Sequence, residues 1–399
     1  MKRRQFLLAA GASAALPLMS FSSRLFAAPP GSPRFLLVFL RGGYDCNNLL
    51  VPYASDFYYE SRPTLAIARP NPGDADSAVA LDADWGLNPV VRDALLPLWQ
   101  RRQLAFVPFA GTTDLTRSHF ETQDHIERGE PDDMTLDYRS GFLARLSRVL
   151  TGVPAIAFTN DLPLSFQGAG HDIPNISLRA DPRASFNPRQ SAILASMYKH
   201  TPLAAATADG LALPRSLSAD LRNEMIRASR GAPGADSFAM ETRRIATLMR
   251  DKYRLAFVDV GGWDTHVSQG STSGGLANNL RNLGTGLAAY ADTMGSDWND
   301  TVVVVLSEFG RTFRENGDHG TDHGHGTVHW VLGGGVRGGR LAGEQLAITQ
   351  PNLLQNRDYR VLNNYRDVLG GVFKRLWGIN DGQLQQVFPQ AQPRDIGLV

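Results

Sequence analysis

Histidine and acidic side chains gather in a few short stretches of this sequence. Seven of the nine histidines fall in three stretches, and these are His119, His125, His266, His319, His323, His325 and His329. Asp264 lies two positions before His266, so in an extended segment both side chains would point the same way. The same two-residue spacing separates His323 from His325, and further acidic residues near these stretches are Asp45, Glu308 and Asp322.

These residue types suit a metal ion. Imidazole and carboxylate ligands without thiolates favour Zn, Mn, Fe or Mg over an iron–sulfur cluster or a cysteine-type zinc site. The alternative is that each loop histidine is simply exposed to solvent or hydrogen-bonded locally. Because several histidines and carboxylates occur together, the pattern favours a metal site.

Ser118 opens a helical pattern, and Glu121 three residues later completes a capping box. A helix cap alone would explain this serine. A hydroxyl at a helix N-terminus also lies in positive potential, which would favour an alkoxide or a bound oxyanion. Nearby, Arg41 and Arg311 could clamp a phosphate or sulfate, or could pair with neighbouring carboxylates. The chain lacks G-x-S-x-G and any phosphate-binding or dinucleotide-binding glycine motif, so an ordinary serine hydrolase is disfavoured.

Four continuous apolar runs must position these residues. They are predicted to be strands buried on both faces and comprise residues 35–40, 104–109, 255–259 and 301–306. Helices are predicted at 89–102, 118–128, 141–150, 188–199, 237–252, 275–294 and 364–377. Two stretches rich in Gly, Pro and polar residues, 161–187 and 310–343, are predicted to be loops and not core elements.

This alternation predicts an α/β fold with a mostly parallel central sheet and helices on both faces. Each predicted strand is followed by polar or glycine-rich sequence that contains one of the motifs, at residues 41–45, 261–266 and 307–312 and, after Gly111, at 117–119. In such a sheet the carboxyl ends of parallel strands lie along one edge, where ligands bind. We therefore expect the four segments to converge.

The composition divides the chain into a leader and a globular part. Residues 1–28 contain Lys2, Arg3 and Arg4, a mostly apolar run and Ala27-Ala28, as in a signal peptide. The spacing of Arg3-Arg4-x-Phe6-Leu7 resembles a twin-arginine signal, which implies export of a folded protein by the twin-arginine translocation machinery to the periplasm or beyond. A retained membrane anchor is the alternative, and no later stretch is apolar and long enough to span a bilayer.

The remaining residues have 36 basic against 39 acidic side chains, a formal charge of −3, which disfavours nucleic acid as a partner. Cys46 is the only cysteine, so an intrachain disulfide cannot form.

Six motifs together resemble a known family. They are L-R-G-G-Y-D at 40–45, R-S-H-F at 117–120, G-G-W-D-T-H at 261–266, S-E-F-G-R-T at 307–312, G-T-D-H-G-H-G at 320–326 and G-G-G-V-R-G-G at 333–339. They resemble a large family of exported bacterial proteins of unknown function that is similar to the alkaline phosphatase and sulfatase superfamily. The resemblance implies one alkaline-phosphatase-like domain over residues 33–378, with residues 379–399 as its C-terminal tail.

The resemblance also implies roles for single residues. The metal ligands would be Asp45, Asp264, His266, Glu308 and His323 or His325, and Ser118 would be the nucleophile. Phe309 stands where the superfamily has a ligating histidine, and Cys46 lacks the C-x-P-x-R setting of sulfatases.

The leading hypothesis is an exported hydrolase of phosphate or sulfate esters that uses one or two divalent ions, Zn, Mn, Mg or Ca. Ser118 would attack an anionic ester and Arg311 would stabilise its charge. The alternative is a non-catalytic binding or assembly protein of the cell envelope that keeps the fold and one metal.

Overall fold

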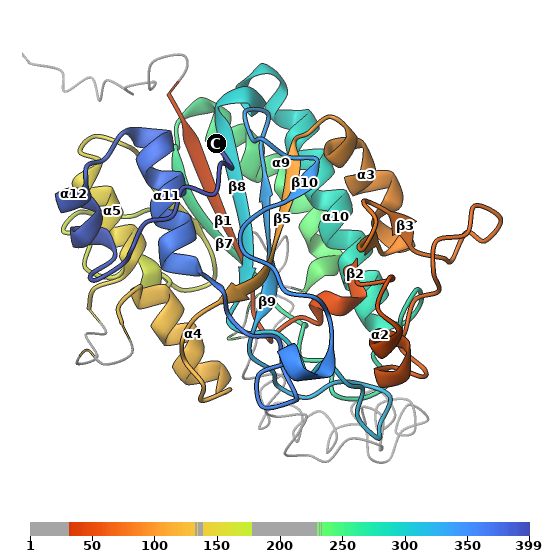
Figure 1. Cartoon of the computed structure of the whole chain (residues 1–399). Coiled ribbons are helices and arrows are strands. Elements are labelled where there is room, and N and C mark those ends of the chain that lie inside the picture. The colour runs from red at the N-terminus through yellow and green to blue at the C-terminus, as the bar shows by residue number, and fades with distance from the viewer. Residues whose placement is uncertain (1–31, 132–133, 135–138, 178–229, 231, 233) are drawn as a thin grey trace, which may run out of the picture.

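The computed structural model describes residues 32–131, 134, 139–177, 230, 232 and 234–399 (Figure 1). The predicted leader at 1–28 and the predicted helix at 188–199 lie outside the described residues. Within the described parts of the chain, no helix combines the length and the apolar character that crossing a bilayer requires.

A mixed sheet of eight strands forms the centre of the molecule, in the order β10-β5-β9-β8-β1-β7-β6, with β11 beside β5. Its strands are β1 (Arg34–Leu40), β5 (Leu104–Gly111), β6 (Ala155–Phe158), β7 (Leu255–Val260), β8 (Thr301–Ser307), β9 (Thr327–Leu332), β10 (Arg340–Leu341) and β11 (Asn363–Asn364). Only β9 runs antiparallel to its neighbours, β5 and β8. The predicted α/β class with a mostly parallel sheet is therefore confirmed.

Helices cover both faces of this sheet. The helices are α2 (Asp56–Ser61), α3 (Arg92–Gln100), α4 (His119–Arg128), α5 (Phe142–Val149), α9 (Ala235–Asp251), α10 (Gly275–Met294), α11 (Tyr365–Trp377) and α12 (Asp381–Val387). In Figure 1, α3, α9 and α10 lie on one side of the sheet, and α5, α11 and α12 on the other. A small antiparallel sheet has the order β2-β4-β3, from β2 (Leu50–Val51), β3 (Val79–Ala80) and β4 (Gly86–Leu87).

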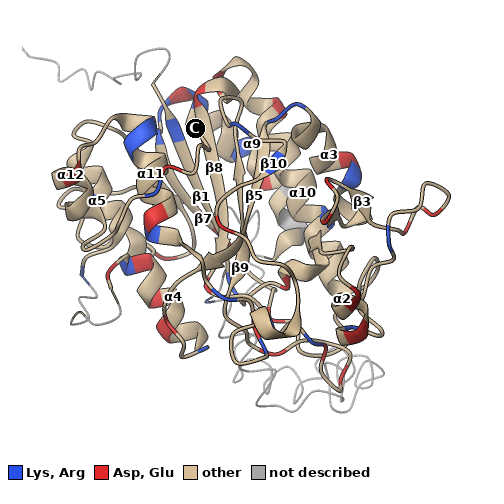
Figure 2. Ribbon diagram, in the orientation of Figure 1, with Lys and Arg blue, Asp and Glu red and all other residues tan. Residues whose placement is uncertain are grey.

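The central strand β1 shows how sequence sets these two layers. Leu36, Val38 and Leu40 pack in the core beneath α3, α9 and α10. The alternate residues Phe35, Leu37 and Phe39 pack in the core beneath α5, α11 and α12. Because successive side chains of a strand point to opposite faces, a strand between two cores is apolar throughout. Figure 2 accordingly shows few charged residues along the strands and most of them on the helices and loops.

One loop prediction is wrong. The stretch 310–343 contains β9, which lies between β5 and β8 in the sheet and includes the buried Trp330. The run Thr327–Leu332 is apolar enough to be a central strand, but the glycine-rich sequence on both sides of it dominated the composition of the stretch. The four predicted strands and the predicted helices at 118–128, 141–150 and 275–294 are confirmed to within two residues at their ends.

The loop between β8 and β9 folds back on itself. The amide of Gly310 donates to the carbonyl of His325, and the amide of Gly324 donates to the carbonyl of Gly310. Residues Arg311 and His323 form an isolated antiparallel bridge. This close approach brings the S-E-F-G-R-T and G-T-D-H-G-H-G motifs together.

Gly324 allows that approach, and its replacement should destabilise the fold. A Cβ at Gly324 would lie 2.4 Å from the carbonyl carbon of Arg311. We expect Gly324→Ala to lower the free energy of unfolding by about 1–3 kcal/mol, as overpacking usually does. Gly317 in the same loop has no heavy atom within 4 Å of such a Cβ and provides the control. Thermal or urea unfolding should separate the two variants, and equal stability would contradict the close packing.

Candidate metal centre

The motifs that follow the strands converge at the carboxyl edge of the sheet. His119 is the first residue of α4, after β5. Asp264 and His266 follow β7, Glu308 follows β8, and His323 lies in the loop between β8 and β9. The predicted convergence of separate segments is confirmed by the contacts between them.

Three imidazole rings point their Nε2 atoms at one another. His323 Nε2 lies 2.9 Å from His119 Nε2 and 3.0 Å from His266 Nε2. The carboxylate of Asp264 completes the group, at 2.9 Å from His266 Nε2, 3.4 Å from His323 Nε2 and 3.5 Å from His119 Nε2. We call His119, Asp264, His266 and His323 the histidine cluster. In the described part of the chain, His119, Asp264 and His323 also form a group whose geometry could hold a metal ion.

The opposite nitrogen of each ring faces an acceptor. His119 Nδ1 lies 2.7 Å from Glu308 Oε1, and His323 Nδ1 lies 3.0 Å from the carbonyl of Arg117. His266 Nδ1 lies 3.4 Å from Asp322 Oδ1. Carboxylate and carbonyl oxygens only accept, so each Nδ1 carries the proton in the neutral ring and each Nε2 presents a lone pair. The lone pairs of His119 Nε2 and His323 Nε2, which lie 2.9 Å apart, repel each other unless a cation or a proton lies between them.

Glu308 supports the cluster from behind. It is fully buried, and its Oε1 also accepts from the amide of Gly42 and from Nε2 of Gln123, both at 2.8 Å. Burial raises the pKa of Glu308, but the hydrogen bond and charge of His119 outweigh it and hold the pKa at about 2. Burial likewise lowers the pKa of His119, and its bonds to Asp264 and Glu308 raise it to about 9. Without a metal ion, a proton can thus occupy the cluster, and a metal would displace it.

Gln123 links Glu308 to a buried arginine. Arg41 Nη1 donates to Gln123 Oε1 at 2.9 Å, which orients the amide so that its nitrogen faces Glu308. Arg41 also pairs with Asp259 at 2.7 Å and with Glu127 at 2.9 Å. Of the two roles considered for Arg41, the structure places it in the ion pair.

Arg311 forms a buried ion pair with Asp264. Its Nη2 is 2.5 Å from Asp264 Oδ1, and its Nη1 is 3.3 Å from His266 Nε2. Burial raises the pKa of Asp264, but Arg311 and the three histidines lower it far below its usual range. The other oxygen, Oδ2, is buried and accepts no hydrogen bond of normal geometry, and its ion-pair contact is His119 Nε2 at 3.5 Å. A carboxylate with one oxygen paired and the other orphaned beside imidazole nitrogens fits a metal ligand.

Asp45 lies outside the histidine cluster. Both of its oxygens are bonded to the buried Arg62, at 2.5 Å and 3.0 Å, and Gln269 Nε2 donates to it at 2.6 Å. Nothing local in the sequence indicated this partner, because Arg62 lies 17 residues further along the chain, directly after α2. The cation beside Asp45 is thus a guanidinium.

The remaining predicted residues are also placed. Glu308 bonds to His119 and not to the centre of the cluster. Of the two alternatives His323 and His325, His323 is the one whose ring joins the cluster, whereas His325 is buried and its carbonyl accepts from Gly310. His119 was not among the predicted ligands, although it lies in the R-S-H-F motif directly after Ser118.

One side of the cluster is open to solvent. The side chains of His266 and His323 are 12% and 16% exposed, and Asp322 is 53% exposed. Ser118 is partly exposed and caps α4, where its Oγ accepts from the amide of Glu121 at 3.4 Å. Solvent can therefore reach the cluster from this side.

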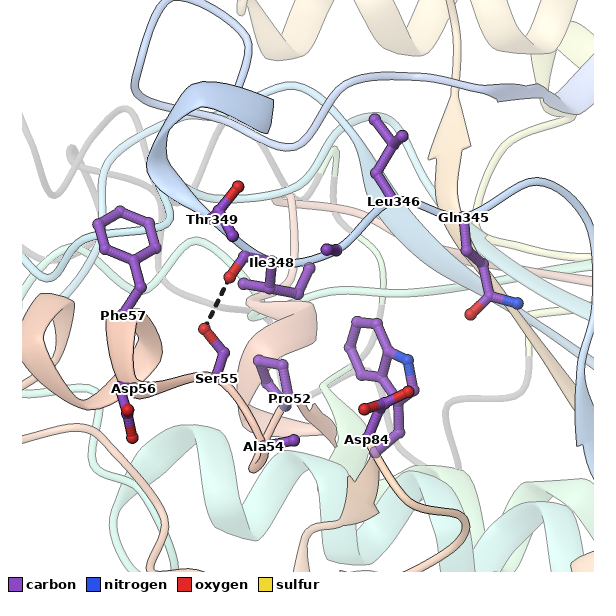
Figure 3. A pocket seen from close by; sticks show the side chains of 12 residues that line it. Pro52, Ala54, Ser55, Asp56, Phe57, Asp84, Gln345, Leu346, Ile348 and Thr349 are labelled. Carbon is purple, nitrogen blue, oxygen red and sulfur yellow. Dashed lines mark hydrogen bonds between the residues drawn. The ribbon is translucent and has the colours of Figure 1, made fainter.

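A separate cavity of ≈ 630 Å³ lies between the segment around Ser55 and the segment around Ile348 (Figure 3). Ser55 Oγ donates to the carbonyl of Ile348 at 2.8 Å across it. None of the residues that line this cavity belongs to the histidine cluster. The candidate metal centre is thus identified by the side chains that converge at the sheet edge, and not by this cavity.

The chain is similar in fold to several solved structures. One is a protein of the alkaline phosphatase superfamily from Vibrio parahaemolyticus, with 11% identity, a TM-score of 0.36, and coverage of 84% of this chain and 69% of that one. Another is the soluble domain of lipooligosaccharide phosphoethanolamine transferase A from Neisseria meningitidis, with 13% identity, a TM-score of 0.36, and coverage of 77% and 78%. A third is the C-terminal periplasmic domain of EcEptC from Escherichia coli in complex with Zn, with 9% identity, a TM-score of 0.37, and coverage of 76% and 73%.

Likeness at this level does not define a shared activity, and no curated protein sequence matches the chain. A family model, by contrast, matches residues 32–388, which is most of the sequence. The chain belongs to the family described as protein of unknown function (DUF1501).

Proposed function

We propose that this protein is an exported metal-dependent hydrolase of phosphate or sulfate esters. The observation that carries the proposal is the convergence of three Nε2 atoms and one carboxylate, with an acceptor facing each Nδ1: Glu308, the carbonyl of Arg117, and Asp322 at 3.4 Å. Histidine ligands in metal sites are held in this way, because the bond at the other nitrogen fixes the tautomer and the ring orientation.

The donor set favours some metals over others. Three imidazoles and one carboxylate suit Zn, Mn or Fe, whereas Mg and Ca prefer oxygen ligands. The proposed ligands are His119, Asp264, His266 and His323. We infer a single ion per chain, since Arg62 supplies the cation beside Asp45.

A divalent ion at this place would polarise an ester oxygen and favour the ionised form of a nearby hydroxyl. Ser118 is the proposed nucleophile: its Oγ forms a bond to phosphorus or sulfur, the bond to the ester oxygen breaks, and the alcohol leaves with one proton. Water then releases phosphate or sulfate and restores the hydroxyl. In this scheme Arg311 acts through Asp264, which it holds in place, and does not itself contact the substrate.

Export follows from residues 1–28, which we propose to be a twin-arginine signal read by the translocation machinery. A protein that folds before export needs no disulfide chemistry outside the cell. This agrees with the single cysteine, Cys46, which is buried and whose pKa burial raises to about 12.

The metal proposal predicts one bound ion per chain. Calorimetric titration of the metal-stripped protein with Zn²⁺ or Mn²⁺ should give a stoichiometry of one with at least micromolar affinity. His119→Ala should weaken binding by more than about 100-fold, because even the loss of a group that only orients a ligand costs about 10–100-fold. His171→Ala provides the control, since this exposed ring bonds Ser147 and lies outside the histidine cluster. Absent binding, or full binding by His119→Ala, would refute the proposal.

The nucleophile proposal predicts different results for two substitutions of Ser118. Asparagine caps helices as well as serine but has no hydroxyl, so Ser118→Asn should keep the fold and lose at least about 100-fold in turnover. Ser118→Thr keeps a hydroxyl and should retain more activity. Both are assayed with a panel of aryl phosphate and sulfate esters, with unfolding curves as a check on stability.

The same panel tests the alternative function. Turnover that Ser118→Asn leaves unchanged would remove Ser118 from the mechanism and leave the metal. A metal-bound wild type that hydrolyses no ester in the panel would favour a non-catalytic binding protein of the cell envelope.

A further inference from the structure

We propose that Asp358 is a positioning residue that holds His323, and with it the turn before Ser118, through two arginines. That this arrangement helps to bind a metal rests on the proposed function. That it orients the ring of His323 does not. We call Asp358, Arg117 and Arg357 the arginine clamp.

The clamp starts from a buried carboxylate. The side chain of Asp358 is fully buried. Arg117 donates to Asp358 Oδ2 through Nε at 2.9 Å and through Nη2 at 2.7 Å. Arg357 Nη1 lies 3.0 Å from Oδ2 and 3.2 Å from Oδ1 of the same carboxylate. One acid thus fixes two guanidinium groups, whose side chains are 23% and 36% exposed.

Each arginine in turn bonds to His323. The carbonyl of Arg117 accepts from His323 Nδ1 at 3.0 Å. Arg357 Nη2 donates to the carbonyl of His323 at 2.7 Å. The ring and the main chain of this histidine are therefore attached to the same carboxylate from two directions. The bond at Nδ1 leaves the lone pair on Nε2, which faces His119 and His266.

The backbone of Arg117 makes this attachment unusual. Its φ is 54°, in the left-handed region that a non-glycine residue rarely adopts. Such a conformation persists only where the surroundings hold it, and the bonds from its own side chain to Asp358 provide that hold. In this conformation the carbonyl of Arg117 faces His323. The next residue, Ser118, caps α4, which begins at His119.

Two explanations of Asp358 can be separated: it positions His323 through the two arginines, or it only adds a negative charge near the site. Removing the carboxylate leaves two guanidinium groups beside a buried site without their common partner, and both attachments of His323 then lose their anchor. Glycine at position 117 can adopt φ 54° at no steric cost, and it removes the side chain with its bonds to Asp358 and to Gln355. If the side chain is what positions His323, Arg117→Gly must weaken the site although its backbone conformation remains allowed.

The test compares Asp358→Asn and Arg117→Gly with the wild type and with Asp395→Asn. Asp395 pairs with Arg375 at 2.5 Å on the exposed surface, so the control makes the same substitution in an ion pair remote from the cluster. Zn²⁺ affinity should fall about 10–100-fold in the two clamp variants and stay within about twofold in the control. The visible spectrum of the Co²⁺-loaded protein should change in the clamp variants only.

A second readout needs no metal. Long-range ¹H–¹⁵N spectra of the metal-free protein, with His323 assigned from His323→Gln, should show the proton on Nδ1 in the wild type and in Asp395→Asn. The two clamp variants should lose that preference. If Asp358→Asn does not fold, Arg117→Gly still decides the question.

An unchanged Nδ1 signal and unchanged Zn²⁺ affinity in the clamp variants would overturn the inference. A wild type that binds no zinc but shows the Nδ1 proton, lost in the clamp variants, would refute the metal proposal and leave the clamp established.

Discussion

The fold of the candidate site depends on the charge of one buried carboxylate, that of Glu308. A fully buried acid is costly to ionise, yet this one accepts from a main-chain amide, a side-chain amide and the ring of His119. These donors come from the end of β1 and from α4, so the ionised acid ties both to the end of β8. Its demand for donors also decides the tautomer of His119. The lone pair that His119 Nε2 presents to the histidine cluster is thus a consequence of the hydrogen bond between His119 Nδ1 and Glu308.

Buried arginine–carboxylate pairs do the same work around the rest of the site. Such pairs connect separate segments, and each has a buried carboxylate: Arg41 with Asp259, Arg62 with Asp45, Arg117 with Asp358, and Arg311 with Asp264. Gln269 extends the second pair, because its Oε1 accepts from Thr265, which lies between Asp264 and His266, and from Thr321, two residues before His323. Forming a buried pair adds little net stability, but breaking one is costly. Such pairs therefore specify one arrangement of loops more than they stabilise it.

The sequence predicts the frame of this site better than its contacts. Continuous apolar runs identify β1, β5, β7 and β8, because a strand between two helical layers has no polar face, and the order of the motifs then predicts their convergence. The partner of a given acid is decided by tertiary packing, so nothing local indicated that Asp45 would bond to Arg62. At the start of α4, Ser118 is the cap and the next residue, His119, is the one that faces the cluster. Which of two adjacent residues faces the site depends on where the helix begins, and the sequence pattern does not determine this to one residue. Nor could composition separate β9 from the glycine-rich loops on either side of it.

Charge near the cluster explains why an anionic substrate would need the ion. The chain after residue 28 has a formal charge of −3, so its net charge does not attract anions. Around the cluster, Asp264, Glu308 and Asp322 face one guanidinium, that of Arg311, which leaves two negative charges when the rings are neutral. A divalent ion would cancel these two charges, and the arginine clamp, which includes the residue before Ser118, would then contribute an excess positive charge, since two guanidinium groups share one carboxylate. For the proposed hydrolase, metal binding and attraction of an anionic ester would in this way be one electrostatic requirement.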